Sequence, residues 1–282
     1  MKTRTMARFF KAQPTIEGAG VYLNRVFGDP EMARFTDPFL LLDDFRSDDP
    51  SKYVAGFPWH PHRGIETITY MLEGSVEHGD SMGNKGIIGS GDVQWMTAGS
   101  GIIHQEMPKG DEKGSMYGFQ LWANLPASCK MIAPRYREVK ASDITEVTLE
   151  RDVKVRIICG SAGGVDGSVK EIVTNPVYLD ISVPPETTYL HPIQNNMTAI
   201  AYIFKGNAVF GEEKVEAGNK TGLLFSNGDN IVVSTRDEGV RFLFLSGKPL
   251  REPITWYGPI VMNTEEELRI AFEEYRKGTF IK

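Results

Sequence analysis

The sequence predicts an all-β protein made of two similar β-barrels or sandwiches, with a short helix at the end of the chain. Three observations support this prediction. Short stretches of alternating apolar residues are separated by Gly-rich turns, the same style recurs in the second half, and helical periodicity is confined to the C-terminal segment. A chain of 282 residues is long enough for two domains, each with a substantial core.

The first half is expected to contain a series of short strands. A Glu73-Gly74-Ser75 turn separates two of these strands, and Gly91-Asp92 marks another turn. Asp43 and Asp44 follow an apolar run and are interpreted as a solvated strand end. The expected strands cover residues 21–26, 38–45, 66–72, 75–78, 93–96 and 119–124.

The second half repeats this plan, with strands expected at residues 153–158, 177–183 and 199–204. Lys205-Gly206-Asn207 corresponds to Glu73-Gly74-Ser75 as a turn between paired strands, and Gly228-Asp229 corresponds to Gly91-Asp92. These matches indicate an internal duplication. The predicted organisation is an N-terminal domain at residues 1–134, a charged linker at 135–141 and a C-terminal domain at 142–282.

The C-terminal segment predicts an amphipathic helix. Thr264 is a candidate cap, and Glu267 stands three residues later, as a capping box requires. Apolar side chains then recur at helical spacing, and Lys277-Gly278 provides a stop. The apolar positions are Leu268, Ala271, Phe272 and Tyr275.

The composition excludes several classes of protein. A net charge of −6 argues against a large nucleic-acid-binding surface, which requires clustered basic residues. No apolar stretch reaches the length of a membrane span, and residues 1–20 lack the pattern of a signal peptide, so a cytoplasmic location is expected. Cys129 and Cys159 are expected to be free thiols, because neither lies near a histidine or a CxxC pattern.

Two short motifs predict a metal site. His60 and His62 are two residues apart, as are His104 and Glu106, and residues i and i+2 of a strand point to the same face. Two such strands would supply three imidazoles and one carboxylate. This set suits a divalent transition metal: it favours iron, with manganese, nickel, copper and zinc as competitors. The alternative is a group of structural histidines in a polar pocket.

Glu66 is a further candidate, because it lies four residues after His62 and would share its strand face. It could serve as a ligand, as a catalytic base or as a group that orients His62; a buried salt bridge to Arg63 is an equally good interpretation. His78 and His191 stand alone and are interpreted as ordinary polar residues. Because the second half has no HxH motif, it is expected to bind no metal.

Six segments of the chain resemble pirins, members of the cupin superfamily. The resemblance runs nearly from end to end, and it implies a bicupin with one metal site in the N-terminal cupin. It also implies His60, His62, His104 and Glu106 as metal ligands, leaves Glu66 outside the ligand set, and makes the C-terminal cupin degenerate and metal-free. The matching segments are residues 39–45, 60–67, 91–108, 120–126, 249–253 and 258–264.

The resemblance implies two alternative functions. Some pirins resemble quercetin 2,3-dioxygenases: Fe(II) or another divalent metal binds the 3-hydroxyl oxygen of a flavonol and lowers its pKa, and Glu106 or Glu66 takes the proton. O₂ then attacks the ring, which opens and loses carbon monoxide. The partners are therefore a planar aromatic substrate and O₂. The alternative is a redox- or iron-sensing regulator that binds transcription factors or metabolic enzymes without turnover.

Overall fold

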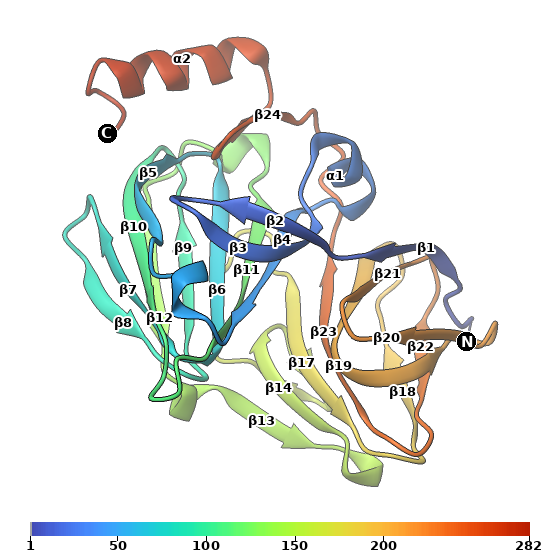
Figure 1. The fold of residues 1–282 in the computed structure, drawn as a ribbon. Coiled ribbons are helices and arrows are strands. Elements are labelled where there is room, and N and C mark those ends of the chain that lie inside the picture. The colour runs from blue at the N-terminus through green and yellow to red at the C-terminus, as the bar shows by residue number, and fades with distance from the viewer. Residues whose placement is uncertain (1) are drawn as a thin grey trace. The chain divides into compact units, whose positions relative to one another are not determined.

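The computed structural model describes residues 2–282, which form two compact units. Unit A contains residues 13–35, 39–142 and 250–282, and unit B contains the remaining described residues, 2–12, 36–38 and 143–249. The units therefore differ at their ends from the expected segments 1–134 and 142–282. The first strand of the chain pairs within unit B, and the C-terminal helix packs within unit A (Figure 1).

Unit A is a two-sheet β-structure, as the sequence predicts. Its larger sheet has the order β12-β9-β6-β11-β4-β3-β2, and its smaller sheet has the order β5-β10-β7-β8, with all named pairs antiparallel. The strands are β2 (Gln13–Glu17), β3 (Val21–Phe27), β4 (Phe39–Ser47), β5 (Phe57–His62), β6 (Ile65–Glu73), β7 (Ser75–Asp80), β8 (Lys85–Ile88), β9 (Val93–Thr97), β10 (Ile102–Lys109), β11 (Met116–Asn124), β12 (Arg135–Val139) and the hairpin β24 (Thr255–Tyr257) and β25 (Ile260–Met262).

Unit B is also built of β-strands, and its main sheet has the order β1-β21-β19-β23-β17-β14-β13. Strand β19 pairs in addition with β20 and β22, and β22 pairs with β18. Its core is aliphatic and aromatic, and both faces of several strands are buried. The strands are β1 (Met6–Lys11), β13 (Thr145–Thr148), β14 (Lys154–Cys159), β15 (Ser161–Ala162), β16 (Val165–Asp166), β17 (Val177–Val183), β18 (Thr188–Pro192), β19 (Thr198–Phe210), β20 (Val215–Gly218), β21 (Thr221–Phe225), β22 (Asn230–Ser234) and β23 (Val240–Gly247).

The two Gly positions expected in turns between paired strands have a different role. At Gly74 the chain leaves the larger sheet of unit A and enters the smaller one, so β6 and β7 are not partners. At Gly206 the single strand β19 bends: it pairs with β23 up to this residue and with β20 beyond it. Both glycines have φ near +70° (74° and 72°), which allows a sharp corner. The predicted hairpin turns were wrong, but the correspondence between the two halves is present.

Residues 135–141 were expected to be a linker, yet residues 135–139 form the edge strand β12, which pairs with β9. Charged side chains are typical of edge strands, and they obscured the strand pattern in the sequence. A short helix, α1 (Pro30–Thr36), was also missed. Its signal is Asp29-Pro30, because the Asp29 carboxylate accepts hydrogen bonds from the amides of Glu31 and Met32.

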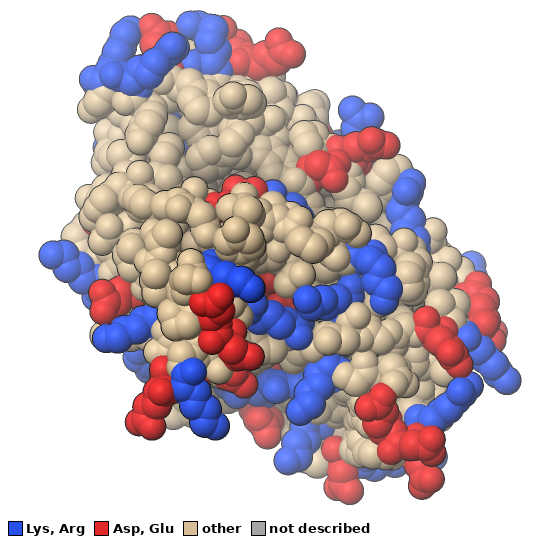
Figure 2. All heavy atoms as spheres, in the orientation of Figure 1, with Lys and Arg blue, Asp and Glu red and all other residues tan. Residues whose placement is uncertain are grey.

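The C-terminal helix α2 (Glu265–Arg276) confirms the predicted capping box: the Thr264 side chain accepts from the Glu267 amide, and the Glu267 carboxylate accepts from the Thr264 amide. Ala271 is the buried residue of this helix, and Arg269 and Lys277 form ion pairs with glutamates of the same helix. Charged side chains gather at this end of the molecule (Figure 2). Neither α-helix in the described part of the chain has the length and apolar content needed to cross a membrane.

His191 in unit B is a buried histidine whose ring lies among core residues. Its Nδ1 accepts from or donates to the Tyr189 hydroxyl at 2.8 Å, and its ring contacts Phe244 edge to face. Burial disfavours the charged imidazolium and lowers the pKa of His191 to about 4. This histidine, interpreted from the sequence as an ordinary polar residue, is therefore a neutral residue of the core.

The stability of the protein is expected to depend on His191 below pH 6.5. Between pH 6.5 and 4 the unfolded chain binds a proton at this side chain that the folded chain does not bind. The neutral His191 therefore contributes fully to the free energy of unfolding above pH 6.5. This contribution is lost as the pH falls, by about 2 kcal/mol at pH 5. Chemical denaturation at pH 7 and pH 5 measures it. His191→Gln, which keeps a partner for Tyr189, should lose less stability than the wild type, and equal losses would contradict the prediction.

Candidate metal centre

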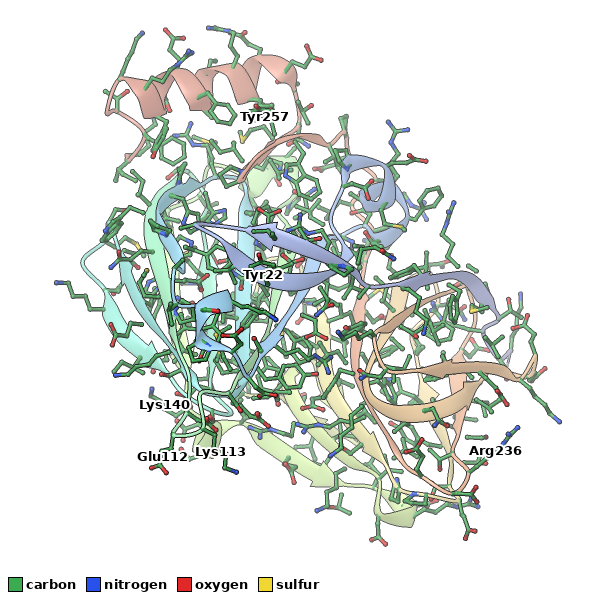
Figure 3. All side chains as sticks on the ribbon, in the orientation of Figure 1. Tyr22, Glu112, Lys113, Lys140, Arg236 and Tyr257 are labelled. Atoms are coloured by element: carbon green, nitrogen blue, oxygen red, sulfur yellow. The ribbon has the colours of Figure 1, made fainter. Side chains whose placement is uncertain are left out.

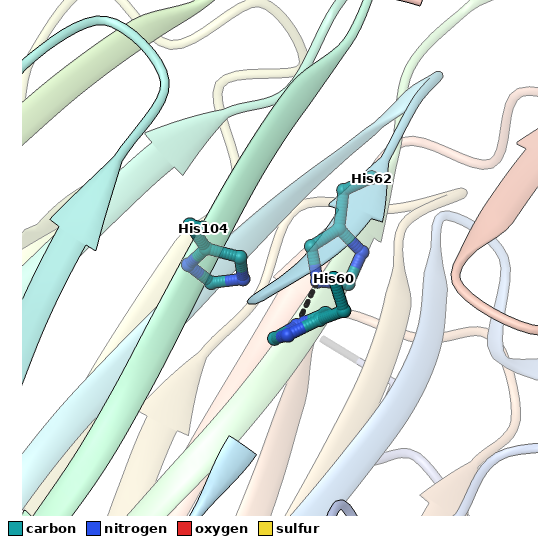
Figure 4. A group of neighbouring side chains, drawn as sticks. All are labelled: His60, His62 and His104. Carbon is teal, nitrogen blue, oxygen red and sulfur yellow. Dashed lines mark hydrogen bonds between the residues drawn. The ribbon is translucent and has the colours of Figure 1, made fainter. Parts of the chain in front are cut away.

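Strands β5 and β10 bring three imidazoles together inside unit A. His104 lies directly opposite His60 in the antiparallel register, and His62 lies opposite Ile102. The donor nitrogens of His60, His62 and His104 lie within 4.8 Å of one another (Figure 4). The i, i+2 spacing on β5 and the pairing with β10 thus produce the convergence that the sequence predicts for these three residues.

Backbone carbonyls fix the tautomers of two of these rings. His60 Nδ1 lies 2.8 Å from the Pro58 carbonyl oxygen, and His62 Nδ1 lies 3.1 Å from that of Pro259. A carbonyl only accepts, so both Nδ1 atoms carry the hydrogen and both Nε2 atoms present lone pairs. These Nε2 atoms are 3.1 Å apart. Two nitrogens that bind one metal at adjacent positions are separated by about 3.0–3.4 Å, so this pair has the spacing of a metal site.

His104 gives a second reason to place a cation here. Its side chain is fully buried, and neither ring nitrogen has a hydrogen-bond partner among residues 2–282. An unpaired buried polar group costs about 1–3 kcal/mol. Burial, with a further effect of the neighbouring rings on His62 and His104, lowers the pKa of all three histidines, so they are neutral donors at pH 7. Neutral imidazoles with free nitrogens fit a divalent transition metal.

Glu106, the fourth expected ligand, lies on the same buried face of β10 as His104. Its carboxylate contacts the Thr69 hydroxyl at 2.8 Å and the Gln120 amide nitrogen at 3.2 Å, while the Thr69 hydroxyl also lies 2.7 Å from the Gln120 amide oxygen. The single hydrogen of the Thr69 hydroxyl cannot be donated both to Glu106 and to the Gln120 amide oxygen. If the Gln120 amide is flipped, its nitrogen donates to Thr69, but its oxygen then faces the Glu106 carboxylate without a hydrogen between them. An ionised Glu106 therefore leaves this group one hydrogen short. Burial raises the pKa of Glu106 to about 7.

Glu66 is placed away from the three histidines. Gly64, with φ of 78°, separates β5 from β6 and breaks the strand parity that the sequence interpretation assumed. Glu66 lies opposite Thr97 and accepts a hydrogen bond from its hydroxyl at 2.7 Å. Thr69, three residues along β6, faces the Glu106 side, so Glu66 lies on the other face of this sheet.

The C-terminal segment of unit A holds the backbone that follows His62. Besides the contact of Pro259 with His62, the Val261 amide donates to the Arg63 carbonyl. The buried Lys130 ammonium donates to the carbonyls of Gly64 and Val261 and to Asn124 Oδ1, at 2.7–3.0 Å. Burial lowers the pKa of Lys130 to about 7. This side chain joins the turn after His62 to the C-terminal hairpin.

Arg63 forms a second connection to the same segment. Its guanidinium pairs with Glu274 at 2.7 Å, donates to the Phe280 carbonyl at 2.8 Å and lies over the Phe280 ring. The salt bridge of Arg63 is thus made with helix α2 rather than with Glu66. Residues 250–282 therefore fix the orientation of His62 from one side, as groups beyond the ligands do in metal sites.

A cavity of about 640 Å³ opens beside His60, His62 and Glu106. Tyr257 on β24 is 70% exposed (Figure 3). It lines the cavity and packs edge to face against Phe272. Trp122 packs edge to face against His62 in the cavity wall. The apolar lining includes Leu23, Leu41, Phe45, Phe57, Val76, Met116, Trp122 and Trp256.

Sequence reasoning missed several polar residues of this cavity. Thr69 and Gln120 could have been found as polar positions on the inward face of apolar strands. Asp43 was taken for a solvated strand end, but it is buried and pairs with Arg25; the adjacent Asp44 is also buried and pairs with Arg46. Each carboxylate tolerates burial because an arginine partner neutralises it.

His78 belongs near the site although it stood alone in the sequence. Its ring centroid is 5.5 Å from that of His104, and its two nitrogens are partnered by Asp80 and Gln94 at 3.2 and 2.8 Å. Because both nitrogens are occupied, His78 lies beside the site without offering a free donor. Cys129 and Cys159 are not joined by a disulfide.

Comparison with known proteins shows the family to which the chain belongs. Residues 20–123 match the family model described as Pirin, and residues 178–281 match that of the Pirin C-terminal cupin domain. A pirin-like protein of Caulobacter vibrioides is 42% identical over 281 residues, which cover 99% of this chain and 100% of the relative. The chain belongs to the pirin family. Its all-β architecture of two cupin units with a C-terminal helix is the fold expected of a pirin.

Solved structures agree with this pirin assignment. A quercetin 2,3-dioxygenase from Acinetobacter baumannii superposes with a TM-score of 0.90 at 30% identity, over 99% of both chains. A bacterial pirin of Escherichia coli in complex with nickel(II) has a TM-score of 0.66 at 23% identity, over 86% of this chain and 98% of that chain. The second likeness shows the shared fold.

Proposed function

We propose that this pirin is a metal-dependent dioxygenase of the quercetin 2,3-dioxygenase type, which opens a flavonol ring with O₂ at a mononuclear non-haem metal. The observation that carries the proposal is the convergence of three neutral imidazoles, with free nitrogens, beside an apolar cavity. The name of the Acinetobacter baumannii neighbour adds support. Fe(II) is the first candidate, and Mn, Ni, Cu and Zn are alternatives.

His60, His62 and His104 would hold the ion, with Glu106 as a fourth ligand or as the base beside it. When bound, a divalent metal supplies the Lewis-acid and redox chemistry that acidifies a flavonol hydroxyl and allows reaction with O₂. Ring opening then releases carbon monoxide. The remaining tasks belong to the protein: binding the flavonol, excluding water and accepting the proton.

Glu106 is positioned to take the proton of the flavonol 3-hydroxyl. The group formed by Glu106, Thr69 and Gln120 is one hydrogen short when Glu106 is ionised, so a proton arriving at Glu106 completes its hydrogen bonds. A pKa near 7 suits a general base at neutral pH. Glu66, on the other face of the sheet, has no such access.

The cavity walls suit a planar aromatic substrate. Trp122 lines the cavity beside His62, and its indole N–H has no acceptor among the described residues. Aromatic and aliphatic side chains around it exclude water, which strengthens electrostatic interactions in the site. The cavity volume is within the range of small-molecule sites.

The test is quercetin turnover by protein reconstituted with Fe(II) without oxygen. Metal content by mass spectrometry should approach one ion per chain. An oxygen electrode should record one O₂ consumed per quercetin, and gas analysis should detect one carbon monoxide released per quercetin. Glu106→Gln should lower kcat/KM by about 100-fold or more, because the base is lost. Glu66→Gln is the matched control and should leave kcat/KM unchanged. Metal binding without quercetin-dependent O₂ consumption would contradict the dioxygenase and favour a regulatory pirin.

A further inference from the structure

A continuous row of polar side chains crosses the inner face of the larger sheet of unit A. Arg25 on β3 lies opposite Asp43 on β4, and Asp43 lies opposite Gln120 on β11. Gln120 in turn lies opposite Thr69 on β6. Directly paired residues of antiparallel strands share a face, so all four side chains point to the same side. All four line the cavity.

The row has two polar ends with different chemistry. Thr69 and Gln120 bind Glu106 at the histidine end. Asp43 and Arg25 form the other end, one and two strands beyond Gln120, respectively. Since neighbouring strands are about 4.8 Å apart, Arg25 lies about 10 Å from Gln120 across the sheet. All four side chains line one cavity, so a ligand that fills the cavity reaches both ends.

The Arg25–Asp43 pair is bidentate and retains unused donors. Arg25 Nε and one terminal nitrogen donate to the two Asp43 oxygens at 2.9 and 2.8 Å, and the other terminal nitrogen donates to Glu17 at 2.7 Å. A guanidinium has five N–H groups, so two remain without a protein acceptor among residues 2–282. Glu17, at the cavity rim, has a side chain that is 41% exposed.

The charges of this group select the kind of substituent it can bind. Two carboxylates already surround one guanidinium, so an additional anion would be repelled. A neutral hydroxyl can accept from Arg25 and donate to Asp43 or Glu17 at the same time. We propose that Arg25 and Asp43 form a specificity subsite that recognises a phenolic hydroxyl at the end of the substrate remote from the histidines. The inference rests on the proposed function in its assignment of a flavonol-like substrate.

Flavones that lack the 3-hydroxyl test the subsite separately from turnover, because they lack the hydroxyl on which the proposed reaction depends. Binding of flavone, 7-hydroxyflavone, 4′-hydroxyflavone and 4′-carboxyflavone to metal-loaded protein is measured by tryptophan fluorescence quenching at pH 7, where the phenolic hydroxyls are largely neutral. At least one hydroxylated flavone should bind about tenfold more tightly than flavone, the gain of one hydrogen bond to a charged group. The carboxylate should bind no more tightly than flavone.

The decisive variant is Arg25→Leu/Asp43→Leu, because replacing both charges by apolar residues avoids an unpaired buried charge. It should reduce the hydroxyl advantage, which is the ratio of the affinity for the hydroxylated flavone to that for flavone, to less than about twofold. Flavone itself should still bind. Arg25→Gln/Asp43→Asn is a second variant in case the first does not fold, and it should reduce the advantage below about threefold. The control is Asp180→Leu/Arg241→Leu, an equally bidentate pair in unit B that does not line the cavity.

The outcomes separate this inference from the proposed function. An unchanged hydroxyl advantage in the Arg25/Asp43 variants, a loss of it in the Asp180/Arg241 control, or tightest binding of the carboxylate would overturn the subsite. A wild-type protein that shows the hydroxyl advantage but no quercetin turnover would overturn the dioxygenase and retain the subsite.

Discussion

Replacing His62 by alanine is expected to lower the affinity for a divalent metal by more than about 100-fold, beyond the 10–100-fold that supporting residues contribute. The variant removes one of three converging donors and leaves His60 Nε2 without its neighbour at 3.1 Å. Competition with a chelating dye measures the affinity, and mass spectrometry measures the metal retained after dialysis. Quercetin-dependent O₂ consumption should disappear with the metal.

His78→Gln is the matched control for this experiment. His78 is also buried and lies beside His104, but both of its nitrogens have protein partners. Its replacement should change metal affinity by less than about tenfold, the lower limit for a supporting residue. If His62→Ala retains metal as well as His78→Gln does, the three histidines are not the ligands.

Replacing Gly64 by alanine is expected to destabilise the protein by about 4 kcal/mol, the sum of backbone strain and overpacking. Gly64 has φ of 78°, and a Cβ atom there would overlap the Val261 carbonyl oxygen. The C-terminal hairpin would have to move away from the turn after His62. Because Pro259 in this hairpin fixes the His62 tautomer, metal affinity should fall as well.

Gly278→Ala separates backbone strain from steric overlap. Gly278 has a similar φ of 71°, but a Cβ atom there meets no atom within 4 Å. Its replacement should cost only about 1–2 kcal/mol and leave metal affinity unchanged. Chemical denaturation and dye competition provide both readouts. Equal destabilisation by the two alanines would show that the contact with Val261 does not matter.

Much of the site follows from local sequence pattern. The i, i+2 spacing places His60 and His62 toward one region and His104 and Glu106 on one face of β10, because a strand alternates its side chains. The capping box and apolar period likewise specify α2 without reference to the rest of the chain. These features depend on neighbours within a few residues, so the sequence alone was sufficient to predict them.

Other features were decided only by the tertiary structure. Glu66 changed face because Gly64 interrupts the strand, and a period of two cannot be carried through a residue with positive φ. Arg25 and Asp43 meet through the register of β3 and β4, which is set by pairing and not by either strand alone. A sequence determines which way a side chain points within a strand, whereas long-range register determines what it meets there.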